Sequence, residues 1–178
     1  MILLVSTCSE KLSELEFVKP IEKILKEMKL ASFTKHYLEI NKPNLEKADK
    51  IIICGTALND FDYVNNLNDF FWIKDCEKPI FGICSGMQII GMFFGSKPKR
   101  KKEIGIGKIN LRKEFLGMKE NFEGYFLHNL SVTKANFEIL ADSGTDISAI
   151  KHKTKPIYGV LFHPEVRNNI LIEEFAKL

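Results

Sequence analysis

The sequence predicts an α/β protein in which a mostly parallel sheet is covered by helices on both faces. Two observations support this fold class. In the first half, short apolar runs rich in β-branched residues alternate with amphipathic stretches, which is the pattern of parallel strands joined by helices. The 178 residues are 45% hydrophobic and 28% charged, a composition typical of a globular chain with a sizeable core. We therefore expect a single domain over residues 1–178.

Four strands and two helices are expected in the first half. Short apolar runs bounded by glycine or polar residues predict the strands, because a strand buried on both faces is a continuous hydrophobic run. Apolar residues three and four positions apart predict the helices. The expected strands are Ile2–Val5, Ser32–Ile40, Ile51–Cys54 and Pro79–Ile83, and the expected helices are Phe17–Met28 and Ser85–Phe94.

The second half is expected to be partly antiparallel. Several apolar segments follow one another there and are separated by turns rather than by helices. A helix closes the chain at Asn169–Lys177. The expected strands are Ile104–Leu111, Tyr125–Val132, Glu138–Ala141, Ser148–His152 and Ile157–Phe162.

Charge and apolar runs argue against nucleic-acid and membrane partners. Twenty-six Lys and Arg residues against 23 Asp and Glu residues leave a net charge of +3, which is too small to indicate a nucleic-acid surface. The longest apolar runs, Met1–Val5 and Ile89–Gly95, are far shorter than the ~20 residues of a membrane span. The four cysteines form no CxxC pair, so reduced thiols in a cytoplasmic protein are expected, and no metal or cofactor is indicated.

The segment Phe81–Gln88 has the pattern of a strand–turn–helix elbow that carries a nucleophile. Cys84 is expected on the turn, where a strained backbone holds its side chain above the sheet. The tight turn leaves room only for very small residues two positions before and after the nucleophile, and these are Gly82 and Gly86. The helix N-terminus also favours the thiolate over the thiol. The alternative is that Cys84 is simply a small buried apolar residue, but the two glycines favour the elbow.

A base and its partner are expected in the segment Gly159–Glu165. Pro164 disfavours helical geometry at His163 and so favours an extended backbone there. In an extended chain His163 and Glu165 point the same way, so the carboxylate can hold one ring nitrogen and stabilise the imidazolium. A single histidine is often structural, but the elbow cysteine in the same chain favours a triad of Cys84, His163 and Glu165.

Together, the segments Gly82–Gln88 and Phe162–Glu165 resemble the class I (triad) glutamine amidotransferases, which carry a GxCxGxQ elbow and a C-terminal HPE. The stretch Lys151–Val160 particularly resembles the stand-alone glutaminase subunits of archaeal GMP synthetases. The resemblance implies a three-layer, flavodoxin-like fold with an open, mostly parallel sheet. It also implies hydrolysis of L-glutamine through a γ-glutamyl thioester, without a cofactor.

The resemblance further implies roles for residues around the nucleophile. The amide of Ser85 and an amide of the Gly55–Thr56 loop would stabilise the oxyanion. His128 would help to shape the substrate pocket, although a hydrogen-bonded strand residue is an equal alternative. The residues implied to line the glutamine pocket are Gln88, His128, Asn129 and Leu130.

Three segments differ from the usual family pattern. One is Leu127-His-Asn-Leu130, where the family has a Ser-His-x-Asp variant. The chain has Gly55-Thr-Ala57 where the family usually has Gly-Gly-Pro, but a backbone donor survives because every residue except proline has an N–H group. Leu161 replaces the usual glutamine before the Phe-His-Pro-Glu sequence. We therefore expect an intact triad in a pocket with non-standard edges.

A separate ammonia-accepting synthetase is the expected partner. The chain carries no P-loop or other nucleotide motif and ends soon after Glu165, so the acceptor chemistry is expected on another polypeptide, such as a GMP synthetase. The basic run Lys97–Lys102 is either a solvated loop or a docking site for an acidic partner face. Two other functions stay open: a γ-glutamyl hydrolase or peptidase with the same triad, and a non-catalytic regulatory subunit that has lost the oxyanion loop.

Three cysteines, Cys8, Cys54 and Cys84, are expected near the carboxyl ends of parallel strands. Open α/β sheets place their ligands at this edge. We hypothesise that Cys54 approaches Cys84 closely enough to form a reversible inactivating disulfide. The alternative is that Cys54 is a buried strand end whose thiol never meets solvent.

Overall fold

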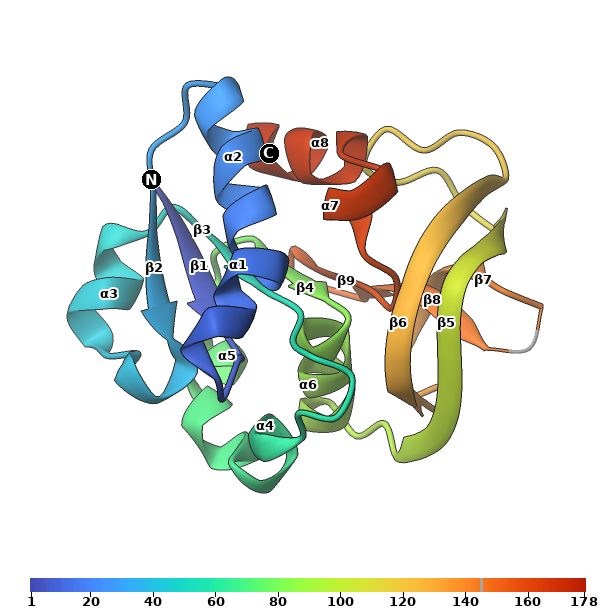
Figure 1. The fold of residues 1–178 in the computed structure, drawn as a ribbon, viewed down its shortest axis with the longest axis horizontal. Coiled ribbons are helices and arrows are strands. Elements are labelled where there is room, and N and C mark those ends of the chain that lie inside the picture. Colours follow the sequence, from blue (N-terminus) through green and yellow to red (C-terminus); the bar gives the residue numbers. More distant parts are fainter. Residues whose placement is uncertain (145) are drawn as a thin grey trace.

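Over the residues that the computed structural model describes, 1–144 and 146–178, nine strands form one sheet (Figure 1). In chain order they are β1 (Ile2–Ser6), β2 (Ser32–His36), β3 (Lys50–Ile53), β4 (Ile80–Ile83), β5 (Pro98–Leu111), β6 (Phe122–Val132), β7 (Phe137–Asp142), β8 (Ile147–His152) and β9 (Ile157–Val160). Their order in space is β2-β1-β3-β4-β9-β8-β7-β5-β6.

The sheet has a parallel half and an antiparallel half. The five strands from β2 to β9 are parallel, and numbered along the chain they have the flavodoxin-like order 2-1-3-4-5. The pairings from β9 to β6 are antiparallel. The expected α/β class and the partly antiparallel second half are confirmed.

Helices cover both faces of the parallel strands. Among the described residues they are α1 (Glu14–Phe17), α2 (Lys19–Glu27), α3 (Lys42–Lys47), α4 (Asp62–Asn65), α5 (Trp72–Asp75), α6 (Ser85–Phe93), α7 (Pro164–Arg167) and α8 (Ile170–Lys177), with 3-10 turns at Lys11–Ser13, Tyr37–Glu39 and Leu67–Phe70. α2 and α8 lie side by side above the sheet, and α6 lies on the opposite face (Figure 1). None of these helices is long and apolar enough to cross a membrane.

Alternate residues of the central strands supply two separate cores. On β1, Ile2 and Leu4 pack into the core shared with α2 and α8, whereas Leu3 and Val5 pack into the core shared with α6. Because successive side chains of a strand point to opposite faces, both sets must be apolar in a strand covered on both sides. This arrangement explains the continuous apolar runs in the sequence.

Three expected segments differ from the structure. The strand expected over Ser32–Ile40 ends at His36, because residues 37–39 form a 3-10 turn that buries Tyr37. The strand expected over Ile157–Phe162 ends at Val160. The basic run expected as a loop belongs almost entirely to β5, which pairs with β6 from Pro98 onward. Charged residues are compatible with this strand because its outer face is exposed to water. The helices α1, α3, α4, α5 and α7 were not predicted, because four to six residues are too short to show a helical period.

Candidate active site

Cys84 lies on a strained turn between β4 and α6. Its backbone has φ 51° and ψ −104°, in the positive-φ region that side chains rarely adopt. A Cβ added to Gly82 would lie 2.5 Å from the carbonyl carbon of Gly86, and a Cβ added to Gly86 would lie 2.3 Å from the Ile53 carbonyl oxygen. Both contacts are far below van der Waals distance, so the turn requires both glycines. The elbow predicted from the sequence is therefore present in the fold.

His163 and Glu165 form a buried pair beside Cys84. His163 has an extended backbone, φ −104° and ψ 93°, immediately before α7, and its Nδ1 lies 2.8 Å from Oε1 of Glu165. Burial disfavours the charged ring, but the neighbouring Glu165 and Cys84 outweigh burial and raise the pKa of His163 well above its ordinary value. The other ring nitrogen, Nε2, is buried and has no hydrogen-bond partner among the described residues. That nitrogen is available for proton transfer.

The Gly55–Thr56 loop lies against both of these side chains. A Cβ added to Gly55 would lie 2.7 Å from Cε1 of His163 and 3.5 Å from Cβ of Cys84. No described residue accepts a hydrogen bond from the N–H of Gly55 or of Thr56. Thr56 is not among the described residues with positive φ, so this position tolerates a residue other than glycine. Ser85, the other expected donor, is the first residue of α6, where an N–H has no acceptor within the helix.

Two polar residues that sequence reasoning missed hold this loop. Thr7 follows β1 and is fully buried, with its Oγ1 3.1 Å from the Cys54 carbonyl oxygen and 3.4 Å from that of Gly55. Asp60 accepts hydrogen bonds from Oγ1 of Thr56, at 2.6 Å, and from the N–H of Ser9, at 2.8 Å. Burial opposes the charge on Asp60, but these hydrogen bonds lower the pKa of its carboxyl. Thr7 was recognisable as a polar residue at the carboxyl end of a parallel strand.

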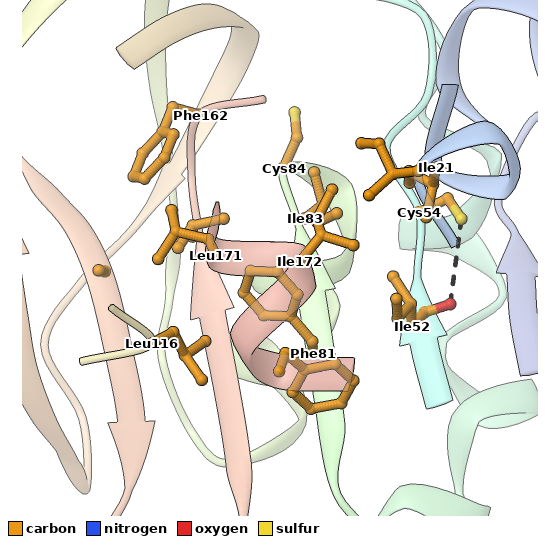
Figure 2. Packing of buried hydrophobic residues seen from close by; sticks show 14 of the residues in the cluster. Ile21, Ile52, Cys54, Phe81, Ile83, Cys84, Leu116, Phe162, Leu171 and Ile172 are labelled. Carbon is orange, nitrogen blue, oxygen red and sulfur yellow. Dashed lines mark hydrogen bonds between the residues drawn. The ribbon is translucent and has the colours of Figure 1, made fainter. Parts of the chain in front are cut away.

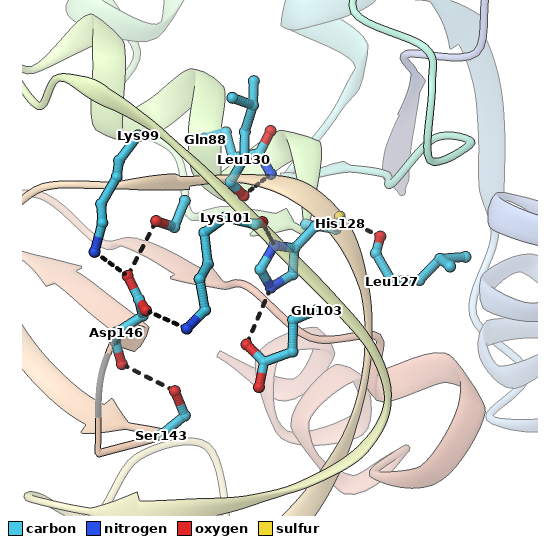
Figure 3. Close-up of polar contacts among 11 residues, drawn as sticks. Gln88, Lys99, Lys101, Glu103, Leu127, His128, Leu130, Ser143 and Asp146 are labelled. Carbon is cyan, nitrogen blue, oxygen red and sulfur yellow. Dashed lines mark hydrogen bonds and ion pairs between the residues drawn. The ribbon is translucent and has the colours of Figure 1, made fainter.

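The side-chain amide of Gln88 makes two hydrogen bonds inside the protein, and Figure 3 shows the one to Leu130. Its Nε2 donates to the Leu130 carbonyl oxygen at 2.8 Å, and its Oε1 accepts a hydrogen bond from the hydroxyl of Tyr63. Tyr63 was not singled out in the sequence, because it lies on the four-residue helix α4. These two bonds fix the orientation of the amide and leave one N–H of Gln88 for a ligand.

Asn129 joins β6 to the loop on the other side of the site. Its Nδ2 donates to the Leu58 carbonyl oxygen at 2.9 Å and to Oδ1 of Asn59 at 3.1 Å. Together with the elbow, these segments border a pocket that encloses only about 10 Å³, roughly the space for one water molecule. Its lining includes Cys84, Ser85, Gln88, Tyr63, His128, Asn129 and Leu130.

His128 is buried against β5 (Figure 3). Its Nδ1 lies 3.1 Å from the Lys101 carbonyl oxygen and its Nε2 lies 3.6 Å from Oε2 of Glu103. Burial lowers the pKa of His128 to about 4, so its ring is neutral at pH 7. Of the two roles considered for His128, these contacts favour the hydrogen-bonded strand residue, which also borders the pocket.

Two lysines of the basic run form ion pairs next to His128. Lys99 and Lys101 each lie 3.3 Å from a carboxylate oxygen of Asp146, whose side chain is buried (Figure 3). The solvated loop expected there is instead a strand with internal charge pairs. Among the described residues, no group of three or more His, Cys, Asp or Glu side chains is arranged to hold a metal ion.

Cys54 is a fully buried strand end. Its sulfur faces the Ile52 carbonyl oxygen, and its side chain points away from that of Cys84 (Figure 2). Burial raises the pKa of the Cys54 thiol well above its ordinary value, which disfavours the reactive thiolate. The structure therefore favours the buried-strand alternative over the disulfide hypothesis.

Comparison with known proteins identifies the family of the chain. The family model for glutamine amidotransferase class-I matches residues 16–174. The glutamine-hydrolyzing GMP synthase subunit of Thermoplasma volcanium is 29% identical over 150 residues, which cover 78% of this chain and 73% of that protein. The corresponding subunit of Methanococcus aeolicus is 34% identical over 162 residues, which cover 85% of this chain and 84% of that protein.

A solved structure has the same fold. The putative GMP synthase subunit of Thermoplasma acidophilum superposes with a TM-score of 0.87 at 24% identity, over 99% of this chain and 92% of that one. The family model spans both halves of the site, from the elbow to the His-Pro-Glu segment. The chain therefore belongs to the class-I glutamine amidotransferase family.

Proposed function

We propose that residues 1–178 form one glutamine amidotransferase domain that hydrolyses L-glutamine to glutamate and ammonia. In this proposal Cys84 is the nucleophile, His163 is the general acid and base, and Glu165 orients the imidazole ring. The observation that carries the proposal is the strained turn at Cys84 beside a buried His163 whose Nδ1 lies 2.8 Å from Glu165. A triad needs this order of nucleophile, base and orienting carboxylate.

In the first half-reaction, the thiol proton of Cys84 passes to Nε2 of His163, and the sulfur attacks the side-chain amide carbon of glutamine. A C–S bond forms, and the carbonyl oxygen becomes an oxyanion. The backbone amides of Ser85 and of the Gly55–Thr56 loop would donate hydrogen bonds to this oxyanion. Nε2 of His163 delivers a proton to the amide nitrogen, the C–N bond breaks, and ammonia leaves a γ-glutamyl thioester.

Water completes the reaction. Nε2 of His163 removes a proton from a water molecule, which attacks the thioester carbon. The C–S bond breaks, glutamate leaves, and the proton returns to the sulfur of Cys84. Each turnover consumes one glutamine and one water and yields one glutamate and one ammonia.

The amide of Gln88 and the backbone of Asn129 and Leu130 would hold the amino-acid end of glutamine. The 10 Å³ pocket between them is too small for glutamine, so substrate binding requires the loop of residues 57–63 or β6 to move outward.

The ammonia would pass to a separate synthetase subunit. The relatives described above carry the name of a glutamine-hydrolyzing GMP synthase subunit, which supports a synthetase that acts on a purine nucleotide. For this chain, both the partner and its acceptor belong to the proposal, as does a cytoplasmic location.

The test is glutamate release from glutamine by the purified chain, with Cys84→Ala as the control. The assay is run on the chain alone and with the GMP synthase partner subunit of the same host. Activity that disappears in Cys84→Ala supports the proposal. Turnover of γ-glutamyl peptides without turnover of glutamine would assign the hydrolase alternative, and no turnover in either condition would assign a non-catalytic subunit.

A further inference from the structure

We propose, on the basis of the function proposed above, that Thr7 is a positioning residue that aims the oxyanion donors of the Gly55–Thr56 loop. Thr7 touches no reacting atom. Its Oγ1 lies 3.1 Å from the Cys54 carbonyl oxygen, 3.4 Å from the Gly55 carbonyl oxygen and 2.9 Å from Oγ of Ser85. One buried hydroxyl therefore faces two successive carbonyl groups of the loop and the first residue of α6.

The directions of these two carbonyl groups determine the directions of two N–H groups. In a trans peptide, the C=O and the following N–H point in opposite directions. Because the carbonyl groups of Cys54 and Gly55 both turn toward Thr7, the N–H groups of Gly55 and Thr56 both turn away from it. Neither N–H donates to a described residue. Two adjacent free N–H groups on one side of the backbone form a concave site for an anion.

The loop that carries these donors lies against the reacting side chains. The added Cβ of Gly55 would be 2.7 Å from His163 and 3.5 Å from Cys84. An oxyanion formed at the carbon that Cys84 attacks is therefore within reach of the same loop. The geometry gives Thr7 an effect on the transition state rather than on the binding of glutamine itself.

A second set of hydrogen bonds, made by Asp60, also holds the loop. Asp60 accepts hydrogen bonds from the hydroxyl of Thr56 and from the N–H of Ser9. The segment after β1 therefore contacts the loop at two places, through Thr7 and through Ser9 and Asp60. Ser85 also donates to the Cys54 carbonyl oxygen at 3.1 Å. This chain lacks the rigid Gly-Gly-Pro sequence that is usual in the family. In its place, the hydrogen bonds of these side chains hold the N–H donors of the Gly-Thr-Ala loop in position.

The first test compares Thr7→Val with Thr7→Ser in glutamate release. Valine keeps the shape of threonine but removes the hydroxyl, whereas serine keeps the hydroxyl. We expect Thr7→Val to lower kcat by at least about tenfold and to change KM by less than about threefold. The upper limit is the loss of about 10²–10³-fold in kcat that follows removal of an oxyanion donor. Thr7→Ser should restore kcat to within about threefold of the parent.

Thr34→Val is the matched control. Thr34 also donates a hydrogen bond through its hydroxyl, to Oε1 of Glu22 at 2.6 Å, but it lies on the edge strand β2. Thr34→Val should therefore leave kcat unchanged. An equal kcat for Thr7→Val and the parent would overturn the proposal, and so would a Thr7→Ser variant as slow as Thr7→Val.

A second test does not depend on turnover and so separates this proposal from the proposed function. Glutaric semialdehyde, a glutamine-like aldehyde, adds to the thiol of Cys84: a C–S bond forms and the aldehyde oxygen becomes the oxyanion, which takes up the thiol proton. Its affinity is measured as protection of Cys84 from alkylation by iodoacetamide. We expect Thr7→Val to weaken protection at least about tenfold while the alkylation rate without aldehyde stays the same. Equal protection would overturn the role of Thr7, even in a chain that does not hydrolyse glutamine.

Discussion

Replacing Gly55 by alanine tests how closely the loop packs on the triad. The new methyl carbon would lie 2.7 Å from Cε1 of His163 and 3.3 Å from its Nδ1. Two carbon atoms pack best at about 3.5–4.0 Å, so the ring or the loop must move by roughly 0.8 Å. A displacement of this size at reacting groups costs up to about 10²-fold in rate. The movement also strains the hydrogen bond between Nδ1 and Glu165.

We expect Gly55→Ala to lower kcat for glutamine hydrolysis by about 10²-fold. The assay is steady-state glutamate release, with the thermal unfolding midpoint measured in parallel to show that the variant is folded. Gly105→Ala is the control, because its added Cβ meets nothing within 4 Å on β5, although its φ of 108° makes alanine strained there. Gly105→Ala should lose stability but keep its activity. A Gly55→Ala variant with kcat within about threefold of the parent would refute the packing argument.

Three further predictions follow from the contacts of the site. Glu165→Gln removes the charge that favours the protonated His163 and should lower kcat by about 10²–10⁴-fold with little change in KM, measured by the same assay. Tyr63→Phe removes the hydrogen bond to Oε1 of Gln88 and should raise KM by about three- to tenfold while kcat changes less, and an unchanged KM would argue against the oriented amide. His128→Asn removes a ring whose pKa burial lowers to about 4. The neutral ring contributes stability that is present above about pH 6.5 and is lost as the pH falls toward 4. The free energy of unfolding is measured with urea at pH 7.5 and at pH 5. Between these pH values the parent should lose about 2 kcal/mol more of it than His128→Asn, and equal losses would contradict the buried neutral histidine.

The nucleophile and its base could be recognised from the sequence because their geometry is local. Two glycines at the required offsets identify the turn at Cys84, and Pro164 sets the extended backbone that aligns His163 with Glu165. Steric rules of this kind act over two or three residues. The alternation of apolar runs and helical stretches predicted the sheet for the same reason, since a strand covered on both faces must be apolar throughout.

The hydrogen bonds that support the site could not be found in this way. Thr7 and Ser85 are 78 positions apart in the sequence, yet their hydroxyl oxygens lie 2.9 Å apart. The sequence also left two roles open for His128, and only its burial against β5 favours one of them. Both faces of β3 are covered by a core, and only the structure shows that the Cys54 side chain packs in the core shared with α2.

The sequence by itself determined the chemical groups of the reaction and the strand–helix alternation that carries them. The tertiary structure decided which backbone amides are free beside Cys84, how Gln88 is oriented and how little space the pocket leaves. The physical reason is that parallel strands end at one edge of the sheet and bring together residues from β1, β3 and β4 that have no local relation. Hydrogen bonds between such residues depend on positions in space, which sequence spacing does not record.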